Sequence, residues 1–123
     1  MTLPSSKSET LLLHNPKCSK SRATRALLEE AGIEFETRLY LEHPLDRAEL
    51  SDLGRRLGLD LVDFTRTAQN EFVESGLSAD SSDAAILDVM VEAPILMQRP
   101  VVVHGQRAII GRPPEAVLAL FDE

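Results

Sequence analysis

Residues 10–22, TLLLHNPKCSKSR, decide the fold of this chain. Residues 10–14 form a short apolar run, which is typical of a buried strand. Asn15 and Pro16 favour a turn, and a helical pattern begins close to Cys18. A strand that passes through a tight turn directly into a helix indicates the opening of a β-α-β unit.

The helix after this turn is predicted to be amphipathic. Gly32 supplies its C-terminal stop. The apolar residues at helical spacing, which form its predicted inner face, are Ala23, Ala26, Leu27 and Ala31. Residues 34–41 then alternate, which predicts a second strand. One side of that strand carries Phe35, Thr37 and Leu39, and the other carries Glu34, Glu36 and Arg38.

The middle of the chain is predicted to be helical, without strands between the helices. One helix is expected over residues 46–58, with Asp46 as its N-terminal cap. A short helical turn over residues 61–67 and a longer helix over residues 82–92 follow.

The last third of the chain returns to strands. The apolar residues 101–103 and 108–110 flank a glycine-containing turn and predict a β-hairpin, and a final helix is expected after Pro113 and Pro114. The whole order is β-α-β, helices, β-β-α. This order predicts an α/β, thioredoxin-like fold with a mixed sheet and a helical insertion between its halves.

The composition is that of a soluble globular protein. The chain has 123 residues, 43% apolar and 27% charged, so a single domain is expected over residues 10–123. Residues 1–9 are rich in serine and are expected to be a disordered tail. The net charge of -7 opposes binding to nucleic acid. No run reaches the roughly 18 apolar residues of a membrane helix or resembles a signal peptide, so we expect a cytoplasmic protein without a membrane partner.

Cys18 is the single cysteine of the chain, so any redox chemistry must use a second, external sulfur. Its place at a helix start favours the thiolate, because unpaired N–H groups and the helix dipole stabilise an anion there. Ser19 and Ser21 add hydroxyl donors, and Lys17 and Arg22 add positive charge. These neighbours favour a reactive cysteine over the alternative, a buried cysteine that only caps the helix.

Four segments carry a resemblance to a known family. They are HNPKCSKSR at residues 14–22, YLEHPL at 40–45, PILMQRPVVV at 94–103 and IGRPPEAVL at 110–118. The first closely resembles the active-site segment of the glutaredoxin-coupled arsenate reductases and their reductase-like relatives. Together the four extend the resemblance over nearly the whole chain after the tail.

The resemblance implies roles for individual residues. It makes Cys18 the nucleophile and His14 a neighbour that helps to hold the thiolate. The same motif contains the further candidate site residues Asn15, Ser19 and Ser21. The oxyanion would be bound by three arginines, Arg66, Arg99 and Arg112, for which the alternative is an ordinary surface cation. A guanidinium suits a tetrahedral oxyanion because it donates two parallel hydrogen bonds. The bond before Pro100 is implied to be cis.

The mechanism implied by the resemblance begins with attack of Cys18 on arsenate. Glutathione then reduces the adduct to arsenite, and glutaredoxin clears the mixed disulfide. The Cys-x-x-Ser pattern fits this scheme because Ser21 stands where a resolving thiol would be, and no bound cofactor is expected. Arsenate reductases built like small tyrosine phosphatases need Cys-x5-Arg. Thr24 stands at the position of that arginine, which excludes this class.

Other functions stay open on the sequence. A related reductase would use the same site for another small oxyanion or thiol adduct. Relatives of this fold also act as transcriptional regulators that bind RNA polymerase, but those commonly carry Cys-x-x-Cys, and Ser21 argues against that class. A glutaredoxin-like monothiol module would not require three arginines. His43 and His104 are assigned to loops, and no metal site is expected because neither has metal ligands at short spacing.

Overall fold

The computed structural model describes residues 3, 4, 6 and 8–121. The chain divides into two compact units, Met1–His43 with Arg99–Glu123, and Pro44–Gln98. The expectation that residues 10–123 form a single domain stays a prediction. The disorder of the tail, residues 1–9, also stays a prediction, and four of its residues, Met1, Thr2, Ser5 and Lys7, lie outside the described residues.

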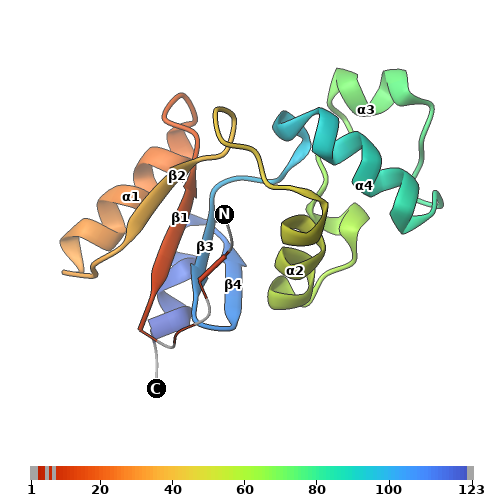
Figure 1. The fold of residues 1–123 in the computed structure, drawn as a ribbon. Coiled ribbons are helices and arrows are strands. Elements are labelled where there is room, and N and C mark those ends of the chain that lie inside the picture. Colours follow the sequence, from red (N-terminus) through yellow and green to blue (C-terminus); the bar gives the residue numbers. More distant parts are fainter. Residues whose placement is uncertain (1–2, 5, 7, 122–123) are drawn as a thin grey trace. The chain divides into compact units, whose positions relative to one another are not determined.

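The first unit is built on a four-stranded sheet within the described part of the chain (Figure 1). Its strands are β1 (Thr10–His14), β2 (Glu36–Leu39), β3 (Val101–His104) and β4 (Arg107–Ile110). The strand order is β2-β1-β3-β4. β1 runs parallel to β2 and antiparallel to β3, and β3 pairs antiparallel with β4. The sheet is therefore mixed, and the predicted thioredoxin-like α/β order is confirmed.

Two helices cover one face of this sheet. They are α1 (Ser19–Glu30) and the 3-10 helix η3 (Pro114–Phe121), which is the predicted final helix in a tighter form. The core between the helices and the sheet consists of Leu12, Leu28, Val102, Val117 and Leu120. Because Leu12 lies opposite Val102 in the strand register, both side chains point to this face. Burial of these side chains fixes α1, and with it Cys18, on the sheet.

α1 buries a different face from the predicted one. Its buried residues are Ser21, Thr24 and Leu28, whereas Ala23 and Ala26 are exposed. The hydroxyl groups of Ser21 and Thr24 both have hydrogen-bond partners within the first unit. Burying them therefore costs little, which the spacing of apolar residues alone does not reveal.

The second strand is shorter than predicted, and its exposure differs from the predicted alternation. Arg38, on the side with the charged residues, is buried, and Thr37 is exposed. Arg38 Nε donates a 2.9 Å hydrogen bond to the carbonyl of His43. The buried charge is stabilised by this bond at the edge of the sheet, where β2 has a partner strand on only one side.

The β3–β4 hairpin includes one of the two histidines for which the sequence predicts a loop. His104 is the last residue of β3, and its Nδ1 lies 2.8 Å from Oγ1 of Thr10. Gly105 turns the chain with φ of 59°, a left-handed conformation that favours glycine. Its N–H donates to the carbonyl of Glu9, which joins the hairpin turn to the residue before β1.

The second unit contains only helices among its described elements, and the predicted helical insertion is confirmed. The elements are α2 (Arg47–Leu57), η1 (Leu61–Phe64), α3 (Asn70–Ser75), α4 (Asp83–Glu92) and η2 (Pro94–Leu96). α3 was not predicted because it buries a single apolar residue, Phe72, and so has no periodicity to detect. None of the described helices has the length and apolar character needed to cross a membrane.

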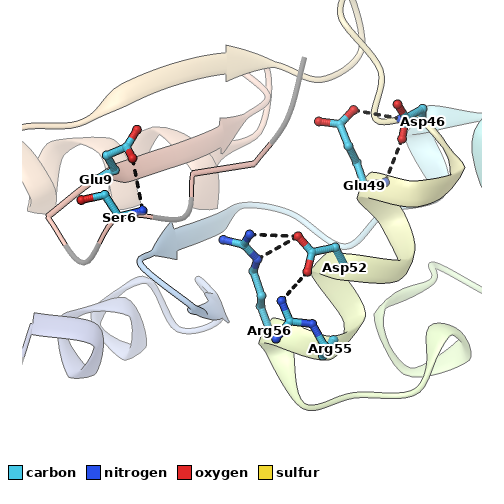
Figure 2. A network of polar contacts seen from close by, with 7 residues as sticks. All are labelled: Ser6, Glu9, Asp46, Glu49, Asp52, Arg55 and Arg56. Atoms are coloured by element: carbon cyan, nitrogen blue, oxygen red, sulfur yellow. Dashed lines mark hydrogen bonds and ion pairs between the residues drawn. The ribbon is translucent and has the colours of Figure 1, made fainter.

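The N-terminus of α2 is capped as predicted (Figure 2). Asp46 Oδ1 accepts a 2.8 Å hydrogen bond from the backbone N–H of Glu49, and Glu49 Oε1 accepts a 3.1 Å bond from the N–H of Asp46. This reciprocal pair is a capping box. Gly58 ends the helix with φ of 69°, a left-handed conformation in which glycine is not strained.

Candidate active site

The turn that carries Cys18 is held by the residues of its own motif. Asn15 Oδ1 accepts a 3.0 Å hydrogen bond from the N–H of Lys17, and the Asn15 carbonyl accepts a 3.0 Å bond from the N–H of Cys18. Arg22 Nη1 donates to the carbonyl of Pro16 at 2.8 Å. These local bonds turn the chain from the end of β1 into α1, with Cys18 as the N-cap residue at φ -95° and ψ 125°.

Cys18 is partly exposed, and its surroundings favour the thiolate. Burial raises the pKa of the Cys18 thiol. The backbone N–H groups of Ser21 and Lys20 lower it, and so do the positive charges of Arg99 and Arg112. Together these lowering effects outweigh burial, so the pKa lies below its ordinary value. Lys20 and Ser21 occupy the second and third positions of α1, where N–H groups lack partners inside the helix. These N–H groups lie at the positive end of the helix dipole, which favours a negative charge on the sulfur.

Arg99 and Arg112 are joined by a hydrogen bond from one residue to the other. Arg112 Nε donates a 2.8 Å bond to the carbonyl of Arg99. Arg99 is half-buried, and its Nε and Nη1 atoms are buried without a hydrogen-bond partner among the described residues. Buried donors that lack a partner cost free energy, so this guanidinium is suited to an anion that supplies acceptors. The bond before Pro100 is cis, as the resemblance implies, and so is the bond before Pro113.

His14 and Ser21 form a buried pair beside the cysteine turn. His14 Nδ1 lies 2.7 Å from Ser21 Oγ, which also accepts a 3.0 Å bond from the N–H of Asn15. The Ser21 hydroxyl, expected as a donor to Cys18, is thus engaged with His14 and Asn15. Burial lowers the pKa of His14, and the positive charges of Arg25 and Arg22 lower it further. The imidazole is therefore neutral near pH 7.

Arg66 belongs to the second unit. The segment around it pairs with residues 96–98, since the N–H of Arg66 donates to the carbonyl of Leu96 at 2.6 Å and Thr65 bridges to Met97. Arg66 Nη1 donates a 3.2 Å hydrogen bond to the carbonyl of Ile95. The role of Arg66 as a third oxyanion ligand stays a prediction, as does the role of the exposed Ser19 at the first position of α1.

Residues 13–120 match the ArsC family. The chain belongs to the ArsC family. Among its relatives is the "Uncharacterized protein YfgD" of Escherichia coli strain K12, 46% identical over 111 residues, which are 89% of this chain and 93% of the relative. An arsenate reductase of Haemophilus influenzae is 40% identical over 114 residues, with 90% of this chain and 97% of the relative covered. A solved structure of the arsenate reductase from Vibrio cholerae has a TM-score of 0.88 and 41% identity, over 91% of this chain and 97% of that one.

Within this ArsC-family protein, the first unit contains three predicted site residues that interact electrostatically. The positive charges of Arg99 and Arg112 lower the pKa of Cys18. The sequence pattern does not single out Lys20, whose side chain is exposed and which acts through its backbone N–H group. Only its place two residues after an N-cap could have indicated this contribution. A thiol of lowered pKa beside two cations is an arrangement of the kind that favours nucleophilic attack on a small anion.

Proposed function

We propose that this protein reduces arsenate to arsenite, with Cys18 as the nucleophile. The observation that carries the proposal is that the charge of Arg99 helps to lower the pKa of the Cys18 thiol. The Nε and Nη1 atoms of this same arginine are buried without a hydrogen-bond partner among the described residues. The relatives named arsenate reductases, at about 40% identity over almost the whole chain, support the choice of substrate.

Oxyanion binding in this proposal is the task of the arginines. Arginine as a residue type is charged at every working pH, and a guanidinium matches the oxygen spacing of a tetrahedral anion. The charge of Arg99 and Arg112 serves two purposes, because it holds the Cys18 thiolate before the substrate binds and balances the substrate's negative charge afterwards. We include Arg66 as a third ligand on the resemblance alone.

The proposed reaction begins with a bond between sulfur and arsenic. The Cys18 thiolate attacks As(V), and one arsenate oxygen leaves as water after protonation. A glutathione thiol then supplies the second sulfur. Cys18 and glutathione are oxidised together to a mixed disulfide, and the two electrons reduce As(V) to As(III), which leaves as arsenite. Attack by a glutaredoxin thiolate on the glutathione sulfur releases Cys18 for the next cycle.

An external thiol is required because the chain has one cysteine. Ser21 occupies the position of a resolving thiol, and its hydroxyl bonds His14 and Asn15. Glutathione as donor and glutaredoxin as partner come from the resemblance. Electrons from thiols are sufficient for the scheme, so it includes no bound cofactor.

The experiment that tests this function is a purified-protein assay of arsenite formation from arsenate with glutathione, with and without glutaredoxin. We expect turnover that depends on both thiols and is absent from Cys18→Ser. Replacement of glutaredoxin by thioredoxin tests the partner, and we expect it to support little turnover. Arsenate reduction that persists in Cys18→Ser, or no reduction with any thiol donor, would contradict the proposal.

A further inference from the structure

Gly111 occupies a position with no room for a side chain. It is buried directly after β4 and directly before Arg112. A Cβ atom placed on it would lie 2.6 Å from Thr24 Oγ1 and 2.8 Å from Pro100 Cγ. Both distances are well inside the 3.5–4.0 Å of favourable carbon contacts. Every residue other than glycine would therefore push these neighbours apart.

Glycine is required at this position because there is no room for a Cβ atom, and not because the backbone has a positive φ angle. Gly32, at the end of α1, has φ of 72° and open space around the position of its Cβ. Gly111 is the opposite case, because it is not among the glycines with positive φ and its surroundings are closed. An alanine at Gly111 would thus need no left-handed backbone conformation, but its Cβ would collide with these neighbours.

The neighbours of Gly111 are the segments that carry the candidate site. The N–H of Gly111 donates a 2.8 Å hydrogen bond to the carbonyl of Pro100, and Arg112 Nε donates a 2.8 Å bond to the carbonyl of Arg99. These two bonds tie the Arg99–Pro100 segment to the Gly111–Arg112 segment. The other wall is Thr24, which belongs to the helix that begins at Cys18. Three segments of the first unit therefore meet at this glycine.

We propose that Gly111 is a positioning residue that sets the distance of Arg99 and Arg112 from each other and from the helix that carries Cys18. Thr24 is bound to its own helix through a 2.9 Å bond from Oγ1 to the Lys20 carbonyl, and Pro100 is a rigid ring. Since neither wall yields easily, an added methyl group displaces the arginine segments. This inference rests on the proposed function for the identity of the anion, but its test needs no turnover.

The test compares Gly111→Ala with Gly32→Ala. For each variant we would measure thermal unfolding, the pH midpoint of Cys18 alkylation by iodoacetamide, and the sulfate concentration that halves the alkylation rate. Gly111→Ala should raise the pH midpoint of alkylation, because misplaced arginines stabilise the Cys18 thiolate less well. It should also increase the sulfate concentration that halves the alkylation rate at least about threefold, because the same arginines bind sulfate less well. Gly32→Ala strains the backbone, so it should lower the melting temperature while both alkylation readouts stay at wild-type values.

The double variant Thr24→Ala/Gly111→Ala carries the test if Gly111→Ala does not fold. Removal of Thr24 Oγ1 relieves the 2.6 Å contact and leaves the 2.8 Å contact with Pro100. In this double variant, the pH midpoint of alkylation and the sulfate concentration that halves the rate should lie between those of wild type and those of Gly111→Ala. If Gly111→Ala cannot be measured, both values should still lie above those of wild type. Folded variants with wild-type midpoint and sulfate protection would overturn the role of Gly111. A wild-type protein that binds sulfate at Cys18 but reduces no arsenate would overturn the proposed function and leave Gly111 supported.

Discussion

Arg112 Nε donates a 2.8 Å hydrogen bond to the backbone carbonyl of Arg99, so the two arginines of the candidate site are coupled directly. The bond fixes one edge of the Arg112 guanidinium and the backbone of Arg99 together. A lysine at position 112 has no Nε–H to donate to this carbonyl, so charge conservation alone does not preserve the bond.

Arg99→Lys should damage catalysis although it keeps the charge. The ammonium cannot reproduce the bidentate contact, and we expect a loss of roughly 1 to 3 kcal/mol of transition-state stabilisation, measured as kcat/KM for arsenate. Arg107→Lys is the matched control, because Arg107 is exposed and donates to the carbonyls of Ala119 and Leu120. Equal kcat/KM for Arg99→Lys and wild type would show that Arg99 is not a ligand.

Cys18→Ser should abolish turnover and leave the fold intact. The serine hydroxyl stays un-ionised at this site and cannot form the bond to arsenic. Cys18 is partly exposed, so the loss of its sulfur leaves little void. Arsenite formation and circular dichroism measure the two outcomes. Activity above about a tenth of wild type would be incompatible with a nucleophilic Cys18.

Asp46→Ala should destabilise the protein by about 1 kcal/mol, because it removes the side chain that caps α2. Urea unfolding measures this loss. Asp60→Ala is the control, since Asp60 precedes η1 without a side-chain capping bond and its removal should have a much smaller effect. Equal losses in the two variants would mean that the capping box contributes nothing specific.

The burial of neutral His14 should make stability depend on pH. The pKa of His14 in the folded protein is lowered from its ordinary value of 6.5, so below that pH the unfolded chain binds a proton that the folded protein does not. The free energy of unfolding should therefore fall as the pH drops below 6.5, by at most about 1.4 kcal/mol per pH unit, until the folded pKa is passed.

Replacement of His14 shows how much of the pH dependence of the free energy of unfolding comes from this residue. His14→Gln should flatten the dependence between pH 5 and 7, whereas His43→Gln removes an exposed histidine and should leave it in place. Urea unfolding at several pH values provides the measurement. An unchanged pH dependence in His14→Gln would show that His14 is not the group responsible.

The features that sequence predicts well are those with local causes. Cys18 stands at a helix start because Asn15 forms the turn within three residues of it. Asp46 and Glu49 are three residues apart, and their capping box needs no partner from elsewhere. Such spacing can be recognised without a structure.

The features that sequence does not predict depend on polar and steric contacts, whether the partners are near in the chain or distant. The inner face of α1 carries Ser21 and Thr24, because His14 satisfies one hydroxyl and a helix carbonyl satisfies the other. The close approach of Thr24 and Pro100 to Gly111 joins three separate segments. Hydrophobic periodicity reports apolar residues and carries no information on these polar and steric contacts.

The pH dependence of Cys18 alkylation tests the central claim most directly. Mass spectrometry would follow iodoacetamide modification of the only cysteine, with and without sulfate, in wild type and in Arg99→Ala/Arg112→Ala. The site predicts a midpoint below the free-thiol value of about 8.5, which sulfate raises by more than chloride of equal ionic strength does. That response to sulfate should disappear in the double variant. A wild-type midpoint at or above the free-thiol value without sulfate would contradict a catalytic Cys18.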